Sequence, residues 1–386
     1  MRDPGPELHK LREDNLYREL KYGSSATGRT YDSDNLALLN FSSNDYLGLG
    51  THESIKEAVS ETIESFGIGS GASRMISGGT TPHFLIEKET ADFFGKNSSL
   101  FFANGYGAAL GTLGAILQKG DTVILDKLCH ASLIDGSRLS GATVRTFPHN
   151  NVERLKKILN SISKNDQKEK RILIVTEGIF SMDGDASSIK EIITLKEEYK
   201  ALLLLDEAHS FGIIGESGKG LANRENLSDG VDFLMTTFGK SAGAAGAVTV
   251  SSKTWTELIL NRARSFIYST APMPSQAAAA LAGLRLIRGS EGEELRNSLH
   301  NNIAYLCNEL QIPKPQGAII PIIIGNELET LKVAENLLIA GILAPAIRYP
   351  TVSKGSARIR ITISASHTEN DIAYLAKTLQ NSLSST

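Results

Sequence analysis

An acid, a histidine and a lysine follow two short apolar runs near the middle of the chain. The leucine run at residues 202–205 is followed by Asp206 and His209, and a second run, residues 232–237, is followed by Lys240. Four consecutive leucines predict a strand buried on both faces, which is typical of a parallel sheet covered by helices. Ligands of open α/β sheets lie beyond the carboxyl ends of the strands, so we expect these three side chains around one ligand.

This combination of residue types suits pyridoxal phosphate (PLP). A lysine forms a Schiff base with the aldehyde of this cofactor, and a carboxylate keeps the pyridine nitrogen protonated so that the ring withdraws electrons. We therefore expect Lys240 to form the Schiff base and Asp206 to pair with the pyridine nitrogen.

Two other interpretations use the same residues. The run Asp206-Glu-Ala-His209 resembles the magnesium-binding box of a helicase, which also requires a GxxxxGK[ST] phosphate loop. Residues 239–241 supply the end of such a loop, but Leu234 stands where its first glycine belongs, which argues against nucleotide hydrolysis. A purely structural role, with the acid capping a helix and the lysine in solvent, remains open for each residue alone.

Two further segments are expected at the same sheet edge. A strand, a turn and a helix around Gly105 and Tyr106 leave backbone N–H groups free at a helix N-terminus, where a phosphate binds well. His130 follows the strand predicted at residues 122–126 and offers a ring that could stack on the cofactor. A structural helix start and a structural histidine are the alternatives here.

Strands and helices alternate through most of the chain, which predicts an α/β fold with a mostly parallel central sheet and helices on both faces. We expect an N-terminal helical arm over residues 1–40, with a helix at 7–22, and a large PLP-binding domain over 41–274. Two prolines near residue 274 mark the start of a smaller α+β C-terminal domain over 275–386. Its strand at 357–364 places Arg358 and Arg360 on one face, where a guanidinium could clamp a carboxylate or simply face solvent on an edge strand.

Composition narrows the classes of function. The 386 residues carry a formal net charge of -3, which gives no reason to expect nucleic acid or an anionic membrane as a partner. Cys129 and Cys307 are too few for a disulfide framework, and no set of metal ligands is expected. The charged N-terminus and the lack of long apolar runs favour a cytoplasmic protein.

Taken together, seven motifs are similar in order and spacing to those of the α-oxoamine synthases, a family of fold-type I PLP enzymes. The similarity extends from about Leu16 to His367. The motifs are Asn44-Asp-Tyr-Leu-Gly48, Gly71-Ala-Ser-Arg74, Cys129-His130-Ala-Ser132, Glu177-Gly-Ile-Phe-Ser181-Met-Asp-Gly184, Asp206-Glu-Ala-His209, Thr237-Phe-Gly-Lys240 and Arg348-Tyr-Pro-Thr351 with Arg358-Ile-Arg360.

The resemblance implies a role for thirteen residues. Four would be catalytic: Lys240, His130, Asp206 and His209. The same four would bind the cofactor together with Gly105, Tyr106, Ser181, Thr237 and, contributed by the partner subunit, Thr270. Four would bind substrates: Arg360 and Asn44 at the carboxylate of the amino acid, and Arg18 and Thr351 at the acyl group.

The resemblance also implies a homodimer with active sites at the interface and a decarboxylative condensation of an amino acid with an acyl thioester. The best-matching members use L-alanine and a pimeloyl thioester in biotin biosynthesis, carried by CoA or by an acyl-carrier protein. Two departures, Tyr349 before Pro350 and Phe238 in the lysine loop, leave open the members that use glycine, serine or other acyl chains. A fold-type I aminotransferase and a cofactor-free binding module are the remaining alternatives.

Overall fold

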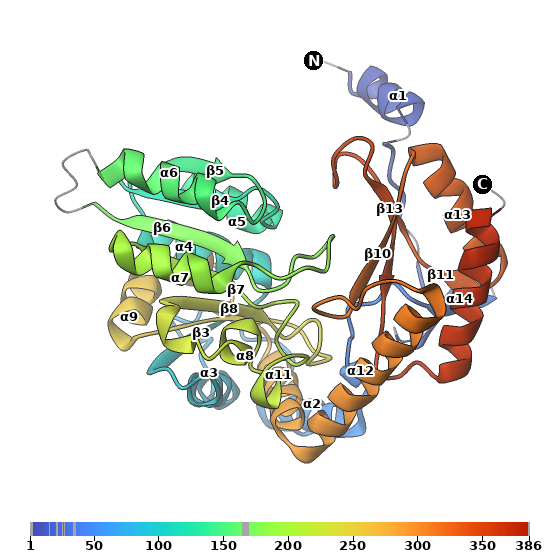
Figure 1. Ribbon diagram of the computed structural model, residues 1–386. Coiled ribbons are helices and arrows are strands. Elements are labelled where there is room, and N and C mark those ends of the chain that lie inside the picture. Colours follow the sequence, from blue (N-terminus) through green and yellow to red (C-terminus); the bar gives the residue numbers. More distant parts are fainter. Residues whose placement is uncertain are drawn as a thin grey trace.

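The computed structural model describes residues 3–14, 16–20, 22–24, 26, 28–33, 36–163 and 170–384. Within them, a seven-stranded sheet forms the larger part of the molecule (Figure 1). Its strands, in spatial order, are β3 (Ser98–Phe102), β9 (Ala247–Ser251), β8 (Phe233–Thr237), β7 (Leu202–Asp206), β6 (Ile172–Glu177), β4 (Thr122–Asp126) and β5 (Thr143–Phe147). The strands from β8 to β5 are parallel, and β9 runs antiparallel to both of its neighbours. The expected mostly parallel sheet is confirmed.

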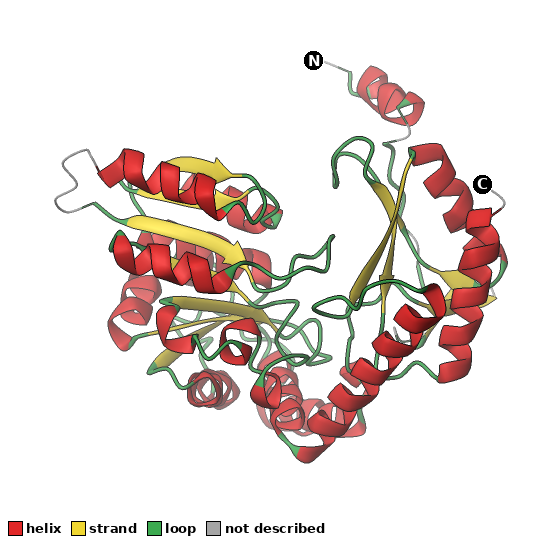
Figure 2. Ribbon diagram, in the orientation of Figure 1, coloured by secondary structure: helices red, strands yellow, loops and turns green. Residues whose placement is uncertain are grey.

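Helices cover both faces of this sheet (Figure 2). Along β7, Leu204 packs into one core cluster, whereas Leu203 and Leu205 pack into the other. One face is covered by α4 (Gly105–Ile116), α5 (Ala131–Leu139), α9 (Lys253–Arg262) and α10 (Arg264–Ile267). The other is covered by α3 (Thr81–Phe94), α6 (Val152–Ser163), α7 (Ile189–Glu198), α8 (Leu221–Arg224) and α11 (Pro274–Arg288), and α2 (Glu53–Phe66) packs on α11. The leucine run is therefore buried on both sides, as its sequence predicts.

A second group of elements lies beside the large sheet (Figure 1). It contains the antiparallel sheet β10 (Ile319–Gly325), β13 (Ala357–Thr362) and β12 (Ala346–Ile347), with helices α12 (Ser290–Leu310), α13 (Glu327–Ile339) and α14 (Glu369–Ser384). Since β13 lies between β10 and β12 and all of its residues are buried, the edge-strand interpretation of this segment is wrong. Both arginines on β13 face protein rather than solvent.

The N-terminal segment joins this second group. The strands β1 (Thr30–Ser33) and β2 (Leu36–Asn40) form a hairpin, and β2 pairs in parallel with β11 (Ile342–Leu343). Short 3-10 turns occur at η1 (Leu49–Thr51), η2 (Glu216–Gly218) and η3 (Ser228–Gly230). Because β2 pairs with β11, segments from both ends of the chain belong to this second group.

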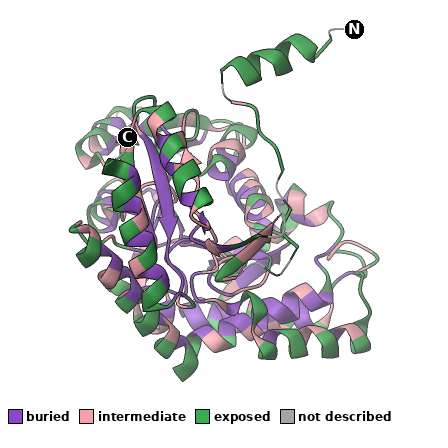
Figure 3. Ribbon diagram, turned by 90° about the vertical axis from the view of Figure 1, so that its right-hand side faces the viewer, coloured by how far each residue is buried: buried purple, intermediate pink, exposed green. Residues whose placement is uncertain are grey.

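The helix expected at residues 7–22 is shorter in the structure. Helix α1 spans Gly5–Glu13, and residues 16–20 are neither helix nor strand. No residue of α1 is buried, and the helix stands away from the rest of the chain (Figure 3). An apolar stripe without a packing partner adds little to helix stability, so the pattern overestimates its length. The domain boundaries at 40 and 274 remain predictions. None of the helices in the described ranges is long and apolar enough to span a membrane.

Candidate active site

The carboxyl ends of the parallel strands surround a cavity of about 210 Å³. Seven of the residues predicted for the cofactor line it: Gly105, Tyr106, His130, Asp206, His209, Thr237 and Lys240. Ser132, Glu177, Ala208, Met235 and Thr236 complete the wall. The sequence motifs from five different segments thus meet in one place.

Lys240 lies at one side of this cavity, beside His209. The distance from Lys240 Nζ to His209 Nε2 is 2.7 Å, and His209 Nδ1 lies 2.6 Å from the hydroxyl of Tyr46. Burial lowers the pKa of Lys240 to about 8, although Asp206 and Glu177 act against this shift. Burial and the neighbouring Lys240 hold the pKa of His209 well below its usual value, so this imidazole is neutral.

Asp206 and Glu177 lie opposite each other at the ends of β7 and β6. Burial raises the pKa of Asp206, and Lys240 acts against the rise. Burial and the nearby Asp206 raise the pKa of Glu177 to about 8, while its Oε1 accepts a hydrogen bond from the His130 backbone N–H at 2.5 Å. Two buried carboxyl groups face a cavity whose lining, among the described residues, contains Lys240 as its only lysine or arginine. A pyridinium N–H of PLP would add a positively charged partner for these carboxyl groups, because it would stabilise the ionised form of Asp206.

Another part of the cavity wall suits a phosphate. Helix α4 begins at Gly105, and the side chain of its N-cap residue, Asn104, accepts from the Gly107 N–H at 2.7 Å. The first N–H groups of an α-helix have no partner within the helix, so those of Gly105 and Tyr106 are available to an anion. Thr237 reaches the same cavity from β8. The described residues therefore fit both the ring and the phosphate of PLP.

His130 connects this cavity to a larger one. Its Nδ1 lies 2.8 Å from the Ser132 hydroxyl, and burial lowers the pKa of its ring. The same residue also lines a cavity of about 610 Å³, to which Ser181 and Thr351 contribute. Ser181 was expected to bind the cofactor, but it lines the larger cavity and not the smaller one.

Arg360 is buried and forms hydrogen bonds with Ser181 and Asn44. Its Nε donates to the Ser181 carbonyl at 2.7 Å, its Nη2 donates to Asn44 Oδ1 at 3.1 Å, and its Nη1 donates to the Thr362 hydroxyl at 3.0 Å. The predicted pair of Asn44 and Arg360 is thus brought together by two segments that are distant in the sequence. A fixed guanidinium of this kind can orient a carboxylate.

Four predicted residues line neither cavity: Asn44, Arg360, Arg18 and Thr270. Asn44 and Arg360 are joined to Ser181 by the hydrogen bonds described above, whereas Arg18 and Thr270 lie elsewhere. Arg18 is exposed in the N-terminal segment and lines neither of these cavities. Thr270 is exposed and pairs with Ser73 beside a small separate cavity, and the role expected for it concerns a second subunit. Their assigned roles remain predictions.

Tyr46, Ser132 and Glu177 are among the residues at the site that were not predicted. Each belongs to a motif quoted above, and Glu177 also ends an apolar run in the same way as Asp206 does. A comparison of strand ends would have identified Glu177.

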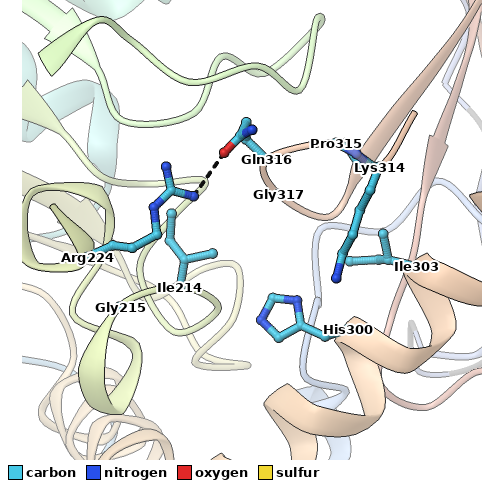
Figure 4. Close-up of a pocket in the computed structure, with 9 residues that line it drawn as sticks. All are labelled: Ile214, Gly215, Arg224, His300, Ile303, Lys314, Pro315, Gln316 and Gly317. Atoms are coloured by element: carbon cyan, nitrogen blue, oxygen red, sulfur yellow. Dashed lines mark hydrogen bonds between the residues drawn. The ribbon is translucent and has the colours of Figure 1, made fainter.

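A further cavity of about 420 Å³ is lined by Arg224, Lys314 and His300 (Figure 4). Arg224 Nη1 donates to Gln316 Oε1 at 3.0 Å across it. None of the predicted site residues lines this cavity, so it is separate from the chemistry described here.

Known proteins resemble this chain over nearly its whole length. The family model described as aminotransferase class I and II matches residues 37–379. An 8-amino-7-oxononanoate synthase of Geotalea daltonii is 39% identical over 95% of this chain and 94% of its own length. One of Herminiimonas arsenicoxydans is 40% identical and covers 97% of both chains.

Solved structures show the same relationship. A serine palmitoyltransferase solved with PLP superposes with a TM-score of 0.92 at 28% identity, and covers 98% of this chain and 96% of its own. An 8-amino-7-oxononanoate synthase of Francisella tularensis gives a TM-score of 0.76 at 27% identity, and covers 90% and 98%. The chain therefore belongs to the class I and II aminotransferase family and, among its PLP-dependent members, to the α-oxoamine synthases.

Proposed function

We propose that this protein condenses L-alanine with a pimeloyl thioester to give 8-amino-7-oxononanoate, carbon dioxide and a free thiol. The observation that carries the proposal is one cavity that joins Lys240, Asp206, His130 and His209. Relatives named 8-amino-7-oxononanoate synthase, 36–40% identical along the chain, support the choice of substrates.

When bound, PLP supplies an aldehyde for covalent attachment and a ring that withdraws electrons from the substrate. Lys240 is suited to the attachment because its lowered pKa leaves part of the amine neutral near pH 7. With PLP and the amino acid bound, the same amine would be placed to accept the proton from the substrate Cα. Asp206 would pair with the pyridine nitrogen of bound PLP and hold a proton there.

The other residues orient the reactants. We assign His130 to stacking on the ring of PLP. Binding of the PLP phosphate is assigned to Gly105, Tyr106 and Thr237. Arg360, held by Asn44, orients the carboxylate of the amino acid until it leaves as carbon dioxide.

The acyl group is assigned to the larger cavity beside His130, where Thr351 lies. Arg18 and Ser181 keep their expected roles in this proposal. We also propose a cytoplasmic homodimer in which Thr270 of the partner subunit completes the phosphate site, as the family resemblance implies.

Thiol release from the PLP-loaded protein tests the proposal. The expected result is release with L-alanine and pimeloyl-CoA, and little release with glycine and acetyl-CoA. A third reaction, L-serine with palmitoyl-CoA, is included because a serine palmitoyltransferase is similar in structure. Release with only one of the last two pairs would assign a different reaction to the same catalytic residues, and Lys240→Ala should release no thiol from any pair.

A further inference from the structure

The larger cavity has walls that suit a methylene chain. It measures about 610 Å³ and meets the cofactor cavity at His130. Its apolar walls come from three separate segments and comprise Leu128, Ile134, Phe180, Met182, Pro350 and Val352. Such walls favour an aliphatic acyl group that begins near His130 and runs away from the cofactor.

Three charged side chains also line this cavity: Lys127, Asp183 and Arg358. Two of them neutralise each other, since Arg358 Nη1 donates to Asp183 Oδ1 at 2.7 Å and also to the Met182 carbonyl. Lys127 has no ion pair with any of the described residues. The lining therefore carries one uncompensated positive charge.

The neighbouring acid does not neutralise Lys127. The carboxylate of Asp126 is buried and accepts from the Leu128 N–H at 2.9 Å, from the Asn150 N–H at 2.9 Å and from His149 at 3.0 Å. The backbone N–H of Lys127 donates to the Phe147 carbonyl at 3.0 Å, so the end of β4 fixes the position from which its side chain starts. Lys127 is exposed and lines the cavity, so its ammonium is available to an anionic ligand there.

We propose that Lys127 binds the terminal carboxylate of the acyl chain and so selects a dicarboxylic acyl thioester over a fatty acyl thioester of equal length. This inference rests on the proposed function, because it assigns the acyl group to this cavity. The Cα atoms of Lys127 and His130 can be at most about 11 Å apart, since His130 is the third residue after Lys127. This upper limit, together with a flexible lysine side chain, is compatible with the length of a pimeloyl chain.

The test compares two substrates that differ only at the far end of the acyl chain, pimeloyl-CoA and the uncharged heptanoyl-CoA. The ratio of their kcat/KM values and the ratio of their dissociation constants are measured for the wild type and for Lys127→Met. The kcat/KM ratio of pimeloyl-CoA to heptanoyl-CoA is expected to fall by about tenfold or more in the variant, because a charge-assisted contact is lost. The corresponding ratio of dissociation constants should rise by a similar factor. Lys127→Arg should restore most of the preference for pimeloyl-CoA.

Lys119→Met is the matched control, because this exposed lysine precedes the opposite end of the same strand and lines neither cavity. Its two ratios should equal those of the wild type. In the wild type, added sodium chloride should weaken pimeloyl-CoA binding more than heptanoyl-CoA binding. This salt test needs no variant, so it remains usable even if the Lys127→Met protein does not fold.

Equal ratios in the wild type and in a folded, PLP-loaded Lys127→Met protein would overturn the inference. An absence of selective salt dependence would do the same. In both cases, turnover of L-alanine with pimeloyl-CoA would leave the proposed function intact. A wild type that releases thiol only with another pair of substrates would instead refute the proposed function.

Discussion

Lys240 and Arg360 are linked by an unbroken series of hydrogen bonds. From Lys240 the series passes through His209 to the hydroxyl of Tyr46, which lies 3.3 Å from Asn44 Oδ1. The same Oδ1 accepts from Arg360. The amine assigned to the cofactor and the guanidinium assigned to the substrate carboxylate are therefore held in one network, whose members strengthen one another in a buried setting.

The first prediction concerns the middle of this network. Tyr46→Phe should lower kcat/KM for L-alanine by about five- to thirtyfold, because His209 Nδ1 loses its partner, at a cost of about 1–2 kcal/mol. Tyr374→Phe is the control, since it also deletes one hydroxyl hydrogen bond, but on the surface of α14. Steady-state rates that are the same in both variants would show that the network has no effect on catalysis.

Loading of the cofactor should depend on pH. Attack on the PLP aldehyde needs the neutral amine, and the pKa of Lys240 in the cofactor-free protein is about 8. The loading rate should therefore rise from pH 6 to about 8 and then level off, as followed by visible absorbance after mixing. Lys240→Ala should give no covalent loading at any pH. A flat profile for the wild type would contradict the lowered pKa.

Asp206→Asn should bind PLP but catalyse poorly. The amide cannot hold the pyridine nitrogen protonated, so the ring withdraws electrons less strongly. We expect a loss in kcat of at least about a hundredfold, which corresponds to roughly 2.7 kcal/mol or more in the barrier. The check is kcat at saturating substrate in a preparation with full absorbance of bound cofactor. Normal turnover would remove the electron-withdrawing role of this pair.

The two arginines of β13 should respond differently to substitution by lysine. Arg360→Lys should raise the KM for L-alanine about tenfold or more, because one ammonium cannot replace a planar guanidinium held by Asn44 and Ser181. Arg358→Lys should change this KM much less, since Arg358 is engaged with Asp183 and Met182. Equal increases in KM would argue that the whole strand, rather than Arg360, positions the amino acid.

His149 should stabilise the fold in a pH-dependent way. Burial acts to lower the pKa of this imidazole, but hydrogen bonds to Asp126 and Asp185 outweigh it and raise the pKa to about 10. A raised pKa gives stability that is complete below the unfolded value of roughly 6.5 and is lost as the pH approaches 10. His149→Gln should therefore destabilise the protein by about 1–3 kcal/mol at pH 6.5, and by much less near pH 10.

Thermal unfolding of the wild type and His149→Gln across this pH range provides the measurement. His300→Gln is a control, because burial lowers the pKa of His300 and its ring is neutral above pH 6.5. Its effect on the melting temperature should stay constant between pH 6.5 and 10. A constant difference for His149→Gln as well would show that His149 is not held in its charged form by Asp126 and Asp185.

The sheet and its ligand edge could be predicted because short apolar runs show directly where strands end. The strand predicted at residues 122–126 has the same bounds in the structure, and Asp206 and Lys240 follow from the ends of two other runs. The contact between Tyr46 and His209 could not be predicted in this way, because it joins segments 163 residues apart. The central position of β13 was also hidden, because β12 has only two residues and shows no periodicity.

The sheet of β1, β2 and β11 is assembled from both ends of the chain. Arg29 binds Asp371 through two hydrogen bonds, and the Phe41 carbonyl accepts from the Thr362 N–H at 2.8 Å. During synthesis on a ribosome, the large sheet can be complete once residue 251 has emerged, whereas the first strands must wait for almost the entire chain. The network from Lys240 to Arg360 can therefore form only after translation is nearly finished. In a nascent chain, Lys240 can reach its folded position long before Arg360 has been synthesised to bind a substrate.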